Sequence, residues 1–109
     1  MPPAHRAWTY ILASRKNGTL YVGVTTNLRV RVRQHRAGAV DGFTKQHHVT
    51  TLVHFEELRE VRHAIAREKE IKGWSRRRKI ELIEYTNPDW DDLARNWFER
   101  GLDPSHGSG

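Results

Sequence analysis

The chain has 109 residues, of which 37% are hydrophobic, and its 19 Lys and Arg against 13 Asp and Glu give a net charge of +6 at pH 7. This composition predicts one small folded domain and excludes a disordered chain. The absence of Cys excludes disulfides, a thiol nucleophile and Cys-based zinc sites, and no apolar run has the length of a membrane helix or a signal peptide, so we expect a cytoplasmic protein.

A β-hairpin is predicted near the N-terminus. Two runs rich in β-branched and aromatic residues, 8–14 and 19–25, flank the sequence Arg15-Lys16-Asn17-Gly18. Asn-Gly is strongly favoured at tight hairpin turns, because both residues tolerate positive φ. The pattern therefore predicts two antiparallel strands joined by this turn.

Residues 26–37 carry two conflicting signals. Apolar and basic residues alternate strictly over 28–33, which is typical of a strand. Thr26 and Asn27, however, are favourable helix N-caps, and Gly38 is a typical helix stop. We therefore predict a helix.

The rest of the chain is predicted as a loop, a third strand and three helices. These are a loop at 38–48 with two Gly and no periodicity, a strand at 49–55, and helices at 60–73, 75–83 and from Asn87 onward, where Asn-Pro-Asp is typical of a helix start. The order β-β-α-β-α-α-α predicts an α/β protein of the α+β type, with helices flanking a three-stranded antiparallel sheet. We expect one domain over residues 1–99 and a flexible tail at 100–109.

Positive charge is concentrated in the first 79 residues. They contain 17 Lys and Arg and 6 acidic residues, whereas residues 80–109 contain 2 Arg and 7 acidic residues. Such a field suits a polyanion, most commonly nucleic acid, although a solvated basic surface would give the same count. We expect the acidic C-terminal part to face away from the substrate. Candidate phosphate contacts lie on three predicted helices and are Arg29, Arg33, Arg36, Lys72, Arg76, Arg77, Arg78 and Lys79.

Glu68 interrupts an apolar stripe. The predicted helix at 60–73 has apolar residues at Val61, Ala64 and Ile65, and the same face reaches position 68 one turn later. A carboxylate on a core-facing stripe is costly unless a cation neutralises it. That cation is either Lys72, four residues further on, or a bound metal ion.

Four other side chains are suited to acid–base or phosphate chemistry. Tyr10 and Tyr21 lie on the two hairpin strands, and Arg31 and His35 share a face of the following helix. A tyrosine pair is usually part of a core and a basic helix face is usually solvated. A phenol close to Arg can nevertheless serve as a general base. The spacings of the seven His match no zinc signature, so we predict no histidine metal site.

These residues occur in an order that resembles a known family. Thr9-Tyr10-Ile11, Tyr21-Val22-Gly23, Thr25-x-Asn27-Leu28, Arg31, His35 and the run 66–72 together resemble the GIY-YIG nuclease superfamily, most closely its small single-domain bacterial group of YhbQ-like proteins. The resemblance extends over about residues 8–95. It implies a small α/β fold around a three-stranded antiparallel sheet, and hydrolysis of DNA phosphodiester bonds with Mg²⁺ or Mn²⁺, in DNA repair or processing.

The resemblance also implies a role for each matching residue. Tyr21 would be the general base, Tyr10 its hydrogen-bonding support, Arg31 the group that stabilises charge on the scissile phosphate, His35 an aid to proton transfer or positioning, and Glu68 the metal ligand. Asn87 is similar to an asparagine of some relatives, but it is explained equally well as a helix N-cap.

The match departs from the family pattern in two of its motifs. The first motif is Trp8-Thr9-Tyr10 instead of Gly-Ile-Tyr, and Val24 stands where some relatives have Lys or Ser. With no appended DNA-binding domain, the basic side chains must hold the substrate without reading its sequence, unless a protein partner supplies targeting. Single-stranded, branched and duplex DNA all remain open.

Two other functions are compatible with the sequence. One is a non-catalytic nucleic-acid-binding module with the same fold. The other is a protein-interaction domain that uses Trp90 and Trp97, although their helical spacing favours packing in the core.

Overall fold

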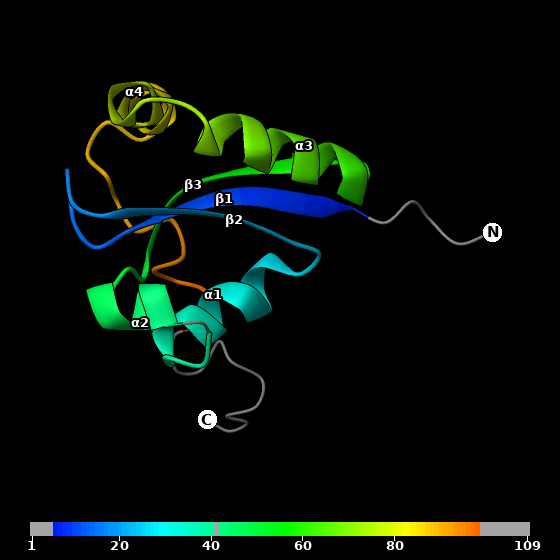
Figure 1. Ribbon diagram of the computed structural model, residues 1–109. Helices are drawn as coiled ribbons and strands as arrows, with labels where there is room; N and C mark the ends of the chain where they lie inside the picture. Colours follow the sequence, from blue (N-terminus) through cyan, green and yellow to red (C-terminus); the bar gives the residue numbers. More distant parts are fainter. Residues whose placement is uncertain (1–5, 41, 99–109) are drawn as a thin grey trace.

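A three-stranded antiparallel sheet lies between two layers of helices in the computed structural model, which describes residues 6–40 and 42–98 (Figure 1). The elements follow the order β-β-α-α-β-α-α: β1 (Ala7–Ala13), β2 (Leu20–Thr25), α1 (Leu28–Arg36), α2 (Gly42–His47), β3 (Thr51–Leu58), α3 (Val61–Lys72) and α4 (Arg76–Thr86). The predicted fold class is therefore confirmed. Over these two ranges, every helix is too short or too polar to cross a membrane.

The hairpin forms as predicted and supplies two of the three strands. Its turn is closed by a hydrogen bond from the Gly18 N–H to the Arg15 carbonyl (2.8 Å), and Asn17 has a φ of 58°. The sheet order is β2-β1-β3, so β1 lies in the centre with both neighbours antiparallel to it.

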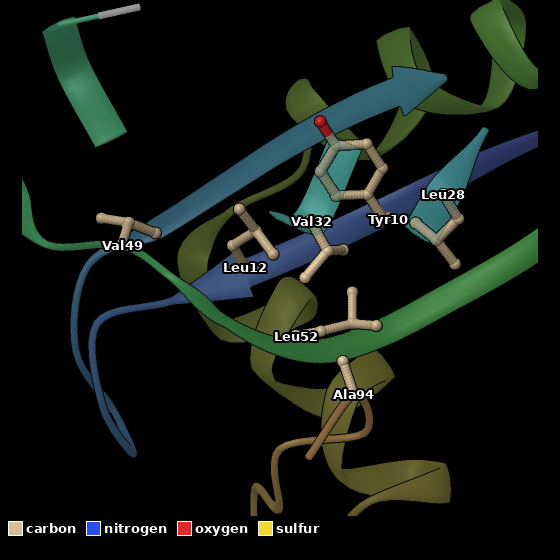
Figure 2. Packing of buried hydrophobic residues seen from close by; sticks show 7 residues of the cluster. All are labelled: Tyr10, Leu12, Leu28, Val32, Val49, Leu52 and Ala94. Carbon is tan, nitrogen blue, oxygen red and sulfur yellow. The ribbon is translucent and has the colours of Figure 1, made fainter. Parts of the chain in front are cut away.

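Each face of the sheet packs against its own pair of helices. Figure 1 shows α3 and α4 over one face, and α1 and α2 over the other. Successive side chains of a strand point to opposite faces. Tyr10 and Leu12 therefore pack toward α1, whereas Ile11 packs with the residues of α3 and α4. Figure 2 shows the α1 side, where Leu28 and Val32 lie over the sheet.

The ambiguous segment after the hairpin is a helix, as predicted. The Asn27 side chain accepts a hydrogen bond from the Val30 N–H (3.3 Å), which is the expected N-cap contact. Leu28, Val32 and His35 are the buried residues of α1. The alternation is misleading because only Leu28 and Val32, four residues apart, share the buried face of the helix, whereas Val30 is exposed.

The loop predicted at 38–48 is wrong in part, because it contains the helix α2. This helix has six residues and one buried side chain, that of Thr44. So short a helix has no apolar periodicity to reveal it. The third strand begins at Thr51 and ends at Leu58, later than predicted.

The helix predicted from Asn87 onward is also wrong. Asn87 caps the C-terminal end of α4, and within the described residues no helix follows it. Its side-chain amide donates to the Val53 carbonyl (3.1 Å) and to the Asp91 carbonyl (2.9 Å). Trp90 then adopts a φ of 56°, which interrupts any helical path. The predicted tail at 100–109 lies outside the described residues.

The segment that follows crosses to the α1 side of the sheet. The Leu93 N–H donates to the Leu52 carbonyl of β3 (2.8 Å), and Ala94 is buried in the cluster drawn in Figure 2. Trp90 packs against the other face of the sheet, and Trp97 is partly buried against the α1 cluster. Both tryptophans therefore pack against the core, although the helix invoked to explain their spacing is absent.

Candidate active site

Three ring side chains from three elements meet on the α1 side of the sheet. The Tyr10 hydroxyl lies 3.0 Å from Nε2 of His35, and the Tyr21 ring centroid lies 5.3 Å from that of His35. Tyr10 and His35 are each 1% exposed, whereas Tyr21 is half-buried. The structure thus brings together three of the predicted residues and leaves Tyr21 as the one that reaches solvent.

Strand register and one glycine create the space for both phenols. Tyr10 of β1 pairs with Gly23 of β2, and Tyr21 pairs with Leu12, so Tyr10 and Tyr21 lie diagonally on the same face. A Cβ atom on Gly23 would lie 2.5 Å from Oη of Tyr10 and 3.0 Å from Cε2 of Tyr21. Any side chain at position 23 would therefore displace the two rings.

His35 also contacts Thr44, a site residue that sequence reasoning missed. Nδ1 of His35 lies 3.1 Å from Oγ1 of Thr44, which is 1% exposed. A neutral imidazole donates through one nitrogen and accepts through the other, so the hydroxyls of Tyr10 and Thr44 take opposite roles toward it. No signal in the sequence pointed to Thr44, because it lies in the segment predicted as a loop.

Arg31 lies one helical turn before His35, on the same flank of α1. It is half-buried, and among the described residues it forms no ion pair. Arg29, Arg33 and Arg36 lie on the opposite flank of the same helix, given 3.6 residues per turn. The guanidinium of Arg31 is therefore the cation of α1 best suited to a phosphate at the Tyr21 cluster.

Glu68 and Lys72 form an ion pair on α3. Nζ of Lys72 lies 2.5 Å from Oε2 of Glu68, which is 9% exposed. The hydrogen bond and the charge of Glu68 raise the pKa of Lys72, although burial opposes this, and the electrostatic influence of Tyr21 adds to the increase. Lys72 therefore neutralises Glu68 as one of the two interpretations expected, which leaves the metal open, and this end of α3 lies within electrostatic range of Tyr21.

The carboxylate and imidazole groups of the described residues fit only a metal ion that takes few ligands from the protein. Over residues 6–40 and 42–98, no three His, Asp or Glu side chains cluster closely enough to hold an ion among them. A single carboxylate is compatible with an ion such as Mg²⁺, which usually keeps several waters and takes further ligands from substrate phosphate.

The basic side chains on the far flank of α1 are occupied by the segment 92–98. Arg29 donates to the Trp97 carbonyl (2.8 Å), Arg36 pairs with Asp92, and Arg33 lies over the Phe98 ring (5.2 Å). Asp92 of the acidic C-terminal part thus lies against the basic helix, while the expectation that this part faces away from the substrate stays a prediction.

The second basic group lies at the start of α4. Arg76 donates to the carbonyls of Asn17 and Gly18 in the hairpin turn (2.6 and 2.7 Å). The other three residues differ in their contacts: Arg77 pairs with Glu81 (3.5 Å), Arg78 stacks over the Trp74 ring (4.1 Å), and Lys79 has no ion pair within the described chain. Because α4 and α1 cover opposite faces of the sheet, the predicted phosphate contacts form two separate groups (Figure 1).

Asn87 is not brought to the Tyr21 cluster. Its side chain is 4% exposed and is engaged with Val53 and Asp91 beside α4. The hydrogen bonds account for its burial without a part in the chemistry.

Several known proteins are similar to this chain in sequence or in fold. A family model described as the GIY-YIG catalytic domain matches residues 6–81. The UPF0213 protein SH2523 of Staphylococcus haemolyticus is 38% identical over 77 residues, which cover 71% of this chain and 93% of that protein. The UPF0213 protein HQ_3675A of Haloquadratum walsbyi is 41% identical over 66 residues, or 61% of this chain and 74% of that protein.

One solved structure is similar over most of the chain. It is the solution NMR structure of the UPF0213 protein BH0048 from Bacillus halodurans, with a TM-score of 0.51 and 26% sequence identity. The similarity covers 86% of this chain and 99% of that one. The three-stranded sheet with its flanking helices is therefore shared with a protein of the same group.

Proposed function

Because the chain belongs to the GIY-YIG family, a nuclease superfamily, we propose that it is a metal-dependent endonuclease that hydrolyses DNA phosphodiester bonds in repair or processing. The observation that carries the proposal is the convergence of Tyr10, Tyr21 and His35 in one cluster, open to solvent at Tyr21. Arg31 lies on the adjoining flank of α1 without a carboxylate partner in the described chain.

Tyr21 acts as the general base in this proposal. In its deprotonated, phenolate form, its oxygen accepts a proton from the water that attacks the phosphorus atom. Tyr10 and His35 are buried and hydrogen-bonded to each other, so they form a rigid wall against which the Tyr21 ring packs. Arg31 stabilises the negative charge that develops on the phosphate oxygens.

Glu68 is the side chain that would hold the divalent metal. Such an ion would supply positive charge that stabilises the phosphate and the leaving oxygen. Lys72 pairs with Glu68 and would compete with the ion for the same carboxylate. We therefore expect weak metal binding in the absence of DNA.

Cleavage assays on supercoiled plasmid and on single-stranded and duplex oligonucleotides test the proposal. With Mg²⁺ or Mn²⁺, we expect Tyr21→Phe, Arg31→Ala and Glu68→Gln to lower the rate by at least about 100-fold. Glu81→Gln is the matched control, since it breaks another i,i+4 ion pair of a helix, that with Arg77. Circular dichroism verifies that each variant is folded.

Two outcomes would contradict the proposal. Retained cleavage by folded Glu68→Gln would remove Glu68 from the reaction. Binding of DNA without metal-dependent cleavage of any substrate would instead favour the non-catalytic module.

A further inference from the structure

Helix α2 presents an exposed aromatic ring beside the candidate general base. Phe43 is 44% exposed, and its ring is stacked on that of Tyr21 with centroids 6.3 Å apart and planes inclined by 29°. His47, one turn further along α2, lies 4.7 Å from the Phe43 ring. The contact between Thr44 and His35 holds this helix against the site.

We propose that Phe43 stacks on an unpaired nucleobase next to the phosphodiester bond that is cleaved. The inference rests on the proposed nuclease function and deepens it, because it names the substrate class: DNA with at least one unpaired base at the cleavage position. Aromatic side chains bind unpaired bases in this way, independently of sequence.

The position of the ring supports this choice of ligand. If Tyr21 activates water at the phosphate, the ring stacked on Tyr21 lies within one nucleotide of the reacting bond. A base inside an intact duplex is covered on both faces by its neighbours and cannot stack on a protein ring unless it leaves the helix. The exposed ring therefore favours single strands, mismatches and frayed ends over perfect duplex.

The surroundings of Phe43 argue against a shielding role and against a protein-docking role. A ring that only shielded Tyr21 would itself be covered, yet almost half of Phe43 is accessible. A protein-docking surface would need neighbouring apolar residues, but the other exposed residues after Phe43 on α2 are Lys45, Gln46 and His47. Lys45 also suits α2 to a negatively charged backbone.

Binding without metal tests the stacking independently of catalysis. Oligonucleotides carry one 2-aminopurine, whose fluorescence reports stacking, in a single strand, at a mismatch in a duplex, or in a perfect duplex. Phe43→Leu keeps an apolar cover on Tyr21 but has no ring, whereas Phe43→Trp keeps a stacking surface. Tyr85→Ala is the matched control, because Tyr85 is an exposed aromatic residue on α4, over the opposite face of the sheet.

We expect Phe43→Leu to weaken binding of the single strand and the mismatched duplex about tenfold and to abolish the fluorescence change, given typical stacking energies. Phe43→Trp and Tyr85→Ala should behave as the unmodified protein, and perfect duplex should give no fluorescence change. The single-strand and mismatch arms show which source of unpaired base is preferred. Unaltered affinity and fluorescence in Phe43→Leu, or an equal response with perfect duplex, would overturn the inference.

Cleavage kinetics separate stacking from mere positioning of Tyr21. Stacking predicts that Phe43→Leu raises KM about tenfold with a smaller change in kcat, and that Phe43→Trp restores KM. A fall in kcat at unchanged KM would mean that Phe43 only holds Tyr21, and would overturn the inference. Absence of cleavage by the unmodified protein would refute the nuclease proposal instead, while the metal-free binding result would still stand on its own.

Discussion

At the scale of single residues, Gly23 determines whether the two phenols can share one face of the sheet. Tyr10 is buried, so its hydroxyl has no free space into which it could retreat from a new methyl group. The glycine is needed here for close packing rather than for an unusual backbone conformation. In the sequence, the only sign of this packing requirement is the glycine of Tyr21-Val22-Gly23.

We predict that Gly23→Ala lowers both stability and cleavage. Overpacking of this kind typically costs about 1–3 kcal/mol of unfolding free energy, and displacement of Tyr10 and Tyr21 should reduce the cleavage rate at least about tenfold. Urea denaturation and plasmid nicking measure the two effects. Gly42→Ala is the control, since an added Cβ there meets no atom within 4 Å and should leave stability unchanged or slightly higher. Unaltered activity in Gly23→Ala would show that the phenols can move.

At the scale of the elements, a charged cluster ties β3 to α3. Both carboxylate oxygens of Glu56 accept hydrogen bonds from Arg67 (2.8 and 3.0 Å), and Oε2 lies 2.8 Å from Nε2 of His54. The hydrogen bond with His54 and the contacts with Arg67 hold the pKa of Glu56 at about 2, below its ordinary value of 4.5, although burial opposes this.

We predict that this cluster makes stability depend on acid pH. The pKa of Glu56 is lower in the folded state, so its stabilising effect is complete above pH 4.5 and is lost as the pH falls toward 2. Glu56→Gln should lower the unfolding free energy at pH 7 by about 1–3 kcal/mol and flatten its decline over this pH interval. Urea denaturation at several pH values measures both effects. Glu57→Gln, which loses only an exposed pair with Arg6, should change neither, and an unchanged pH profile in Glu56→Gln would contradict the prediction.

Local signals predicted the elements whose geometry is set within a few residues. The hairpin follows from Asn17-Gly18, and α1 follows from the N-cap at Asn27. At Asn87 the same kind of signal failed, because a long-range hydrogen bond to Val53 takes the side chain that a helix start would use. Pattern alone could not reveal such a bond across 34 residues.

The candidate site shows the same difference between residues that local motifs reveal and residues that long-range contacts bring in. Tyr10, Tyr21 and His35 could be predicted because they stand in recognisable motifs. Thr44 and Phe43 could not, because they reach the site on a helix of six residues that depends on contacts with α1 and β2. Hydrophobic periodicity in the sequence does not reveal such contacts.

Asn87→Ala should destabilise the protein without altering the chemistry. The substitution leaves the buried Val53 carbonyl without its side-chain partner, which costs about 1–3 kcal/mol, and it also removes the partner of the Asp91 N–H. Thermal or urea denaturation measures the loss, and the folded fraction should cleave at the normal rate. Asn96→Ala, at an exposed position, should leave stability unchanged. Normal stability but lost cleavage in Asn87→Ala would assign Asn87 to the active site after all.

At the scale of the whole molecule, the basic side chains of α1 and α4 lie over opposite faces of the sheet (Figure 1). Some of them are already engaged in contacts within the protein. Part of the basic side chains serves the fold: Arg36 pairs with Asp92, and Arg76 holds the hairpin turn. The count of 19 Lys and Arg therefore overstates the cations that are available to a phosphate backbone.

This division predicts an uneven salt dependence of DNA binding. Arg31→Ala should reduce the slope of log affinity against log salt concentration by about 0.7–0.9, the value for one lost phosphate contact. Arg36→Ala should leave the slope nearly unchanged and lower stability, because its charge is already used by Asp92. Titrations of labelled oligonucleotides without metal measure both slopes. Equal slope changes in the two variants would show that Arg36 leaves Asp92 to contact DNA.

The return of residues 93 and 94 to the α1 side has a consequence for how the domain can be cut or joined. The family match ends at residue 81, yet the Leu93 N–H hydrogen-bonds to β3 and Ala94 fills the space beside Leu52 (Figure 2). A fragment that ended at residue 81 would expose the apolar residues of the sheet that pack beneath α1 to water. We therefore expect the autonomous unit to extend to at least residue 98, so a partner domain joined at the C-terminal end should be attached beyond that point.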